Sequence, residues 1–132
     1  MSISSKKITS KDFRKPDERR EFKSHGHLDV LKFDDGSTVG RGVFEPGWRW
    51  SNDIRPIVDT KSCEAEHMGY CLKGKMTIRM DSGEEIQLKA GEAFHIPAGH
   101  DAWVDGAEVC ELLDFSGFAA YAISKGQIKK SA

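Results

Sequence analysis

The sequence lacks several features that would place it in a specialised class of protein. No apolar run among its 132 residues approaches the roughly 20 that cross a bilayer, and the first twenty residues have no apolar core like that of a signal peptide. Only three cysteines are present, Cys63, Cys71 and Cys110, and an odd, sparse set argues against a disulfide framework. We therefore expect a cytoplasmic protein that has no membrane partner.

The chain also lacks an excess of charge of either sign. Twenty basic residues offset 21 acidic ones, which leaves a formal net charge of -1 with no basic tail, so we expect no nucleic-acid partner. There is no glycine-rich phosphate loop and no nucleophile elbow. No helix-period segment longer than about two turns stands out. With 38% hydrophobic and 31% charged residues, the chain has the composition of one ordinary globular domain.

Short alternating segments separated by turn residues are what the sequence does contain. Strands are expected at 27–33 and 38–44, from residue 62 into "HMGYCLKG", at 76–80 and 85–89, and in short pieces up to residue 115. Such spacing predicts an all-β sandwich or barrel. We expect a mobile or loosely packed N-terminal segment at 1–24, a barrel at 25–123 and a C-terminal tail at 124–132.

The order of these strands and turns resembles the small single-domain cupins, in particular a subgroup with "GWRWS" and "GHDAW" segments. Gly91, Pro97 and Gly99 fall on the spacing of the second cupin motif, and Gly74 fits the glycine of the first. The resemblance extends over about residues 44–115 and implies a double-stranded β-helix, that is, a jelly-roll barrel. It also implies that the chain forms a homodimer, because cupins frequently pair through their sheets.

The metal ligands of the family are not kept in this chain. Many cupins hold a divalent metal through two histidines and a carboxylate in the first motif and a histidine in the second. Here Lys61 and Cys63 take the places of the two histidines, and His67 takes that of the carboxylate. Ala102 replaces the last histidine, while His100 lies two residues earlier. The usual site therefore cannot be carried over.

These residues allow two interpretations, and the first is a metal site built from the substituted ligands. Cys63 and His67 share one parity of a strand, and a thiolate with the imidazoles of His67 and His100 would suit one divalent transition metal such as Zn, Ni, Mn or Fe. Four residues of straight strand span about 13 Å, so the two can share an ion only if the chain bends at "EAE". Otherwise Cys63 is a small core residue and His67 a hydrogen-bonded histidine lining a pocket.

The tryptophans are the second indication of a functional site. Trp50, Trp103 and His67 are predicted to line a pocket for a small organic molecule at the barrel mouth. The alternative is that the tryptophans plug the barrel or make a dimer contact.

Three functions follow from these patterns. The first is a small-molecule-binding cupin with a degenerate metal site and no cofactor. The second is a metal-dependent cupin enzyme of the isomerase, dioxygenase or decarboxylase type that uses the altered ligands. The third is a structural homodimer that binds partners. The sequence favours the binding module and does not name the ligand.

Overall fold

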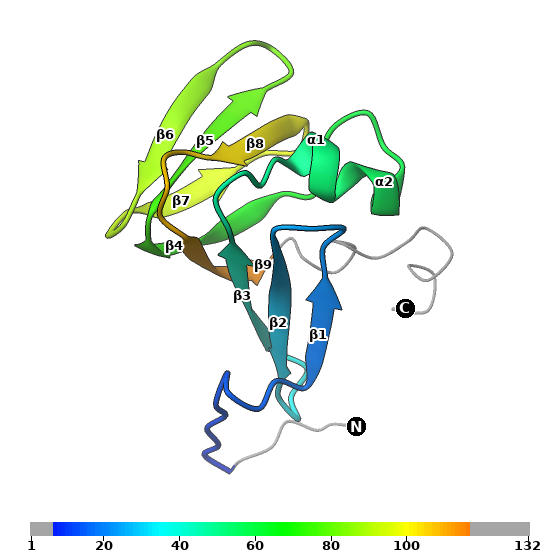
Figure 1. Cartoon of the computed structure of the whole chain (residues 1–132). Coiled ribbons are helices and arrows are strands. Elements are labelled where there is room, and N and C mark those ends of the chain that lie inside the picture. The colour runs from blue at the N-terminus through cyan, green and yellow to red at the C-terminus, as the bar shows by residue number, and fades with distance from the viewer. Residues whose placement is uncertain (1–6, 117–132) are drawn as a thin grey trace.

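Two antiparallel sheets make up the computed structural model, which describes residues 7–116 (Figure 1). The larger sheet has six strands in the order β1-β2-β3-β9-β4-β7, and the smaller has three in the order β6-β5-β8. The strands are β1 (Glu18–Glu21), β2 (Gly26–Lys32), β3 (Thr38–Phe44), β4 (His67–Lys73), β5 (Lys75–Met80), β6 (Glu85–Lys89), β7 (Ala93–Ile96), β8 (His100–Val104) and β9 (Cys110–Ser116). This arrangement confirms the predicted all-β fold.

The core lies between the two sheets because each strand buries alternate side chains. On β3 the buried positions are Gly40, Gly42 and Phe44, and on β8 they are His100, Ala102 and Val104. The remaining core is mostly aliphatic and aromatic, and includes Leu28, Val30, Met76, Ile78, Leu88, Phe94, Ile96 and Leu112. Burying one face of each sheet against the other is what stabilises such a sandwich.

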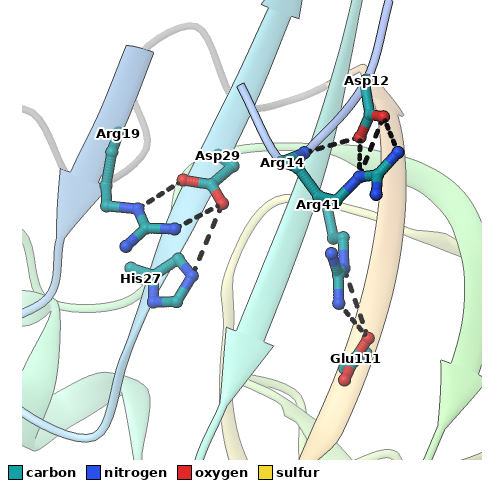
Figure 2. A network of polar contacts seen from close by, with 7 residues as sticks. All are labelled: Asp12, Arg14, Arg19, His27, Asp29, Arg41 and Glu111. Atoms are coloured by element: carbon teal, nitrogen blue, oxygen red, sulfur yellow. Dashed lines mark hydrogen bonds and ion pairs between the residues drawn. The ribbon is translucent and has the colours of Figure 1, made fainter. Parts of the chain in front are cut away.

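Charged pairs cross the outer face of the larger sheet, away from this core (Figure 2). Arg19 of β1 donates two hydrogen bonds to the buried carboxylate of Asp29 on β2, at 2.7 and 2.9 Å. Arg41 of β3 pairs with Glu111 of β9 at 2.7 Å. Because Leu28 and Leu112 are the sequence neighbours that face the core, these charges lie on the opposite face.

Some elements were not expected from the sequence. Glu18–Glu21, inside the segment predicted to be loosely packed, forms β1 and pairs with β2. Two single-turn helices, α1 (Trp50–Asp53) and α2 (Arg55–Val58), come next; α1 begins at the second tryptophan and lies beside β8 in Figure 1. The expected strand around residue 62 begins only at His67. The predicted tail at 124–132, and the end of the predicted barrel at 117–123, lie outside the described residues.

The helices among residues 7–116 are too short to span a bilayer.

Candidate functional site

The path of the chain around residues 63–67 creates the candidate site. Cys63 is not part of β4; it forms an isolated bridge with His100, donating its N–H to the His100 carbonyl at 2.8 Å. Residues 64–66 then leave regular structure, and His67 begins β4 in the other sheet. The chain therefore bends at "EAE", as the metal hypothesis required, and passes from the smaller sheet to the larger one within four residues.

Gly99 makes the turn that places His100 beside Cys63. Its φ of +92° is one that residues with a Cβ rarely adopt, and its N–H donates to the Cys63 carbonyl at 2.7 Å. His100 follows directly as the first residue of β8 and is 4% exposed, so it lies inside the molecule and not at a rim.

Cys63, His67 and His100 come together as a buried cluster. One donor atom from each lies within 4.8 Å of the others, and the Cys63 Sγ is 3.7 Å from Nε2 of His67. Tetrahedral bonds of about 2.3 Å to sulfur and 2.0–2.1 Å to nitrogen place two such donors about 3.5 Å apart. The Cys63–His67 pair already has this separation, so the donor set fits a zinc-like ion in chemistry and in size.

Both imidazole rings are held in orientation through a hydrogen bond of Nδ1. Nδ1 of His67 donates to the Asp114 carboxylate at 2.7 Å, and Nδ1 of His100 donates to the Pro97 carbonyl at 2.8 Å. Because a carboxylate and a carbonyl only accept, both Nδ1 atoms carry a proton, and Nε2 of each neutral ring keeps its lone pair. This is the arrangement of a metal-ligating histidine supported by an outer hydrogen bond.

Asp114 is the site residue that sequence reasoning missed. It lies on β9 opposite Gly69 of β4, and its second oxygen accepts the Ser116 N–H at 3.0 Å, which aims the carboxylate at His67. It is 47 residues from His67 in the chain, and no motif connects the two. The only available signal was an acidic residue on the inward parity of the last strand.

The electrostatics of the cluster favour ionisation of Cys63. Burial opposes a charged thiolate, but the neighbouring His100 and His67 outweigh it and lower the pKa of Cys63 from 9.0 to about 6. Burial likewise opposes a charged His67, yet Asp114 and Cys63 together raise its pKa from 6.5 to about 9. Burial raises the pKa of the other two cysteines, Cys71 and Cys110. Only Cys63 is thus prepared to act as a thiolate.

A largely apolar cavity opens on this cluster, with about 50 Å³ available to the centres of water-sized molecules. His67, His100 and Asp114 form its polar end. The other lining residues come from both sheets and from residues 48–50, where α1 begins: Leu28, Gly42, Phe44, Trp48, Trp50, Met76, Ile78, Phe94, Ile96, Ala102 and Leu112. One ordered water needs about 10–15 Å³ and a cavity that holds benzene about 150 Å³, so the enclosed space suits a few waters or a ligand of only a few heavy atoms.

Two of the three tryptophans line the cavity, and the third lies outside it. Trp50 and Trp48 line the cavity, and their indole N–H groups are buried without a hydrogen-bond partner among the described residues. Trp103, predicted as a third pocket residue, is not among the lining residues; its ring lies 4.3 Å under the Arg49 guanidinium. On β8 the inward positions are Ala102 and Val104, so Trp103 faces the other way.

Part of the chain matches a known domain family. Residues 62–116 match the family model described as the cupin domain. Comparison with curated proteins finds no match.

Solved structures share the fold at low identity. The polyketide cyclase RemF of Streptomyces resistomycificus aligns with a TM-score of 0.58 at 21% identity, over 82% of this chain and 78% of the cyclase. A protein of unknown function from Acidithiobacillus ferrooxidans aligns at 0.53 and 20%, over 74% and 86%. A cupin-like protein from Thermotoga maritima aligns at 0.51 and 20%, over 73% and 71%. The chain therefore has the cupin fold and carries a cupin domain, as its motifs predicted.

Proposed function

We propose that this cupin domain binds one divalent transition metal, with zinc as the first candidate, and uses it to hold a small organic molecule. The observation that carries the proposal is the convergence of Cys63, His67 and His100 within 4.8 Å at the polar end of an apolar cavity. A sulfur and two imidazole nitrogens suit zinc and other late transition metals better than magnesium or calcium.

The hydrogen bonds that orient the three donor residues favour a metal site over a chance cluster. The two rings are oriented by Asp114 and by the Pro97 carbonyl, and Cys63 is fixed by backbone hydrogen bonds to β8 and its turn. Pre-oriented donors lose little freedom on binding an ion, which is what outer-shell partners provide in metal sites.

A metal-dependent enzyme is the second candidate, and the number of protein donors favours it. Structural zinc sites are closed by four protein ligands, whereas catalytic sites have three and leave one position for water or substrate. Here three donors converge, and two of the three residues, His67 and His100, also line the cavity. The fold carries enzymes, since one neighbour is by name a polyketide cyclase, but fold alone does not assign a reaction.

Metal content measured on untagged protein purified without chelator tests the proposal. We expect about one equivalent of metal per chain in the wild type, or after incubation with Zn²⁺, and less than a tenth of that in His67→Ala and Cys63→Ala. His95→Ala is the matched control, because His95 is half exposed on the outer face of β7 and pairs with Glu66. Its metal content should equal that of the wild type.

A wild type that retains no metal after incubation with Zn²⁺, Ni²⁺, Mn²⁺ and Fe²⁺ would refute the metal site. A metal retained equally in all three variants would place the ion elsewhere. Either result would leave a metal-free pocket with His67, His100 and Asp114 at its polar end.

A further inference from the structure

We propose that two copies of this chain pair through the outer face of β4 and β9, about a twofold axis that passes through an apolar patch. The patch consists of the outward side chains Met68, Tyr70, Leu72, Leu113 and Phe115. The contact is independent of the proposed metal, because the patch lies on the side of β4 and β9 that faces away from the cavity.

β4 carries apolar side chains on both of its faces. The residues at its inward positions are buried, whereas Met68, Tyr70 and Leu72 between them are 38–49% exposed. An antiparallel strand with one face in water ordinarily alternates apolar with polar residues, and strands that are covered on both faces have continuous apolar runs. β4 therefore has the composition of a strand covered on both faces, although the described residues leave its outer face open.

β9 extends the patch on one side of β4. Leu113 lies directly opposite Tyr70 in the register of the two strands. Phe115 follows Asp114, which lines the cavity, and is 52% exposed on the outside. On the other side of β4, Ala93 of β7 is paired with Tyr70. Directly opposed side chains on one face of a sheet are within contact distance, so Tyr70 stands in the middle of the patch.

The other half of the same sheet face is built for water. Over β1, β2 and β3 the outward positions carry charged side chains that pair within the chain, such as Arg19 with Asp29 and Arg41 with Glu111 (Figure 2). The apolar half begins immediately beside Arg41, which is opposite Leu113 in the register of β3 and β9. A contiguous exposed apolar area next to a well-solvated one marks an interaction site.

The charges that border the patch favour a second copy of the chain as its partner. On one side Arg41 pairs with Glu111, which is also opposite Lys73 at the end of β4. On the other side His95 of β7 pairs with Glu66. Basic and acidic groups thus occur together at both borders, and no surplus of one sign selects an acidic or a basic partner. A twofold axis through the patch places apolar surface on apolar surface and lets acidic groups meet basic ones.

The size of the face also fits a dimer. At about 200 Å² for each large side chain, the four exposed members of the patch present on the order of 400 Å² of apolar surface, which is within the range of functional patches on monomers. A stable interface buries about 800 Å² on each partner, with a polar rim around an apolar centre. With Leu113, Ala93 and the charged borders added, the outer face approaches this area.

Sedimentation equilibrium of the full chain over a concentration series tests the proposal. We expect a dimer with a dissociation constant of about 10 µM or lower, since interfaces of this size reach micromolar affinity or better. Tyr70→Lys and Tyr70→Glu should each raise this constant at least about hundredfold, because a twofold contact brings the same residue of both copies together and like charges repel. An equimolar mixture of the two variants should form a heterodimer at least about tenfold tighter than either variant alone.

A second variant and a matched control complete the design. Leu72→Lys places a charge elsewhere in the patch and should also give a monomer, which covers the case in which the Tyr70 variants fail to fold. Ile86→Lys is the control, because Ile86 is 48% exposed but lies on β6 of the smaller sheet. The same change of chemistry there should leave the dissociation constant unchanged.

Three results would overturn the proposal. The first is a full chain that remains monomeric throughout the series, whether its patch is bare or is covered by its own residues 117–132. The second is a dimer as tight in Tyr70→Lys and Leu72→Lys as in the wild type, which would place the contact on another surface. The third is a loss of association in both Tyr70 variants without recovery in their mixture, which would refute the face-to-face arrangement.

Discussion

Asp114 and His67 show at the residue scale how a buried polar pair prepares a site. A charged imidazole next to a carboxylate at 2.7 Å is stabilised by much more than an exposed pair, because little water screens it. The pair also directs Nε2 of His67 towards the Cys63 sulfur. Removing the carboxylate should therefore change both the titration of the ring and its orientation.

Asp114→Asn in metal-free protein tests this role. His67 has a folded pKa of about 9 against 6.5 unfolded, so its contribution to stability is complete below about pH 6.5 and disappears as pH rises through 9. We expect the substitution to lower the pKa of His67 and to cost about 3 kcal/mol at pH 6, with the cost shrinking above pH 9. NMR titration of the ring and urea unfolding at several pH values measure both effects.

Asp29→Asn is the matched control for that substitution. Asp29 is as buried as any acidic residue in the described chain, but it pairs with Arg19 on the opposite face of the sheet (Figure 2). Its replacement should destabilise the protein and leave the His67 titration in place. An unchanged His67 titration in Asp114→Asn would show that the carboxylate does not hold the ring.

The individual site residues were predictable only where a motif marked them. His67 and His100 stand near positions that the cupin motifs designate, and Cys63 takes the place of a family histidine and shares the strand parity of His67. Asp114 has no such marker, because no motif includes it and its partner is 47 residues away. Trp103 shows the converse, since its place beside the second motif suggested the pocket, while the strand parity of β8 turned its ring outward.

At the scale of elements, β4 and β9 carry the geometry of the site, and Gly69 allows them to approach. The register between these strands shifts between Met68 and Gly69, which brings Asp114 opposite Gly69. A Cβ at Gly69 would lie 1.9 Å from the Leu113 carbonyl oxygen and 2.7 Å from the Phe94 ring. The closest neighbour is backbone, so only a separation of the strands could relieve the clash.

Gly69→Ala should therefore be among the most damaging single-methyl changes in the chain. We expect a loss of about 3 kcal/mol or more in the free energy of unfolding, at the upper end of overpacking effects, together with loss of metal binding. Urea unfolding and metal content measure the two effects. Gly83→Asn is the control, because Gly83 lies in the β5–β6 turn with nothing within 4 Å and asparagine tolerates a left-handed backbone. Wild-type stability in Gly69→Ala would contradict the tight approach of β4 and β9.

Elements with apolar alternation and turn residues were predicted well, and the others were not. β2, β3, β5 and β6 lie within a residue of their expected positions because each shows a period of two between glycine or aspartate turns. β1 reads "ERRE", and its pairing depends on β2 and not on its own pattern. The helices α1 and α2 have four residues each, too few for a helical period to show.

At the scale of the whole molecule, the proposed metal would join the two sheets. His67 belongs to the six-stranded sheet and His100 to the three-stranded one, while Cys63 lies on the segment that crosses between them. The sequence predicted this sandwich from strand spacing and motif order, but not the crossing at residues 64–66, since no glycine or proline demands it. The homodimer stays a prediction.

Zinc should accordingly stabilise the fold as a cross-link between sheets. Binding to the folded state alone adds about 2.7 kcal/mol when free zinc is 100 times its dissociation constant, which corresponds to a rise in Tm of about 10 °C for a domain of this size. Scanning calorimetry with and without Zn²⁺ measures the shift. His100→Ala removes the donor from the smaller sheet and should abolish most of it, while His95→Gln, on the outer face, should retain it in full. An equal rise in His100→Ala would mean that zinc acts at a place that does not bridge the sheets.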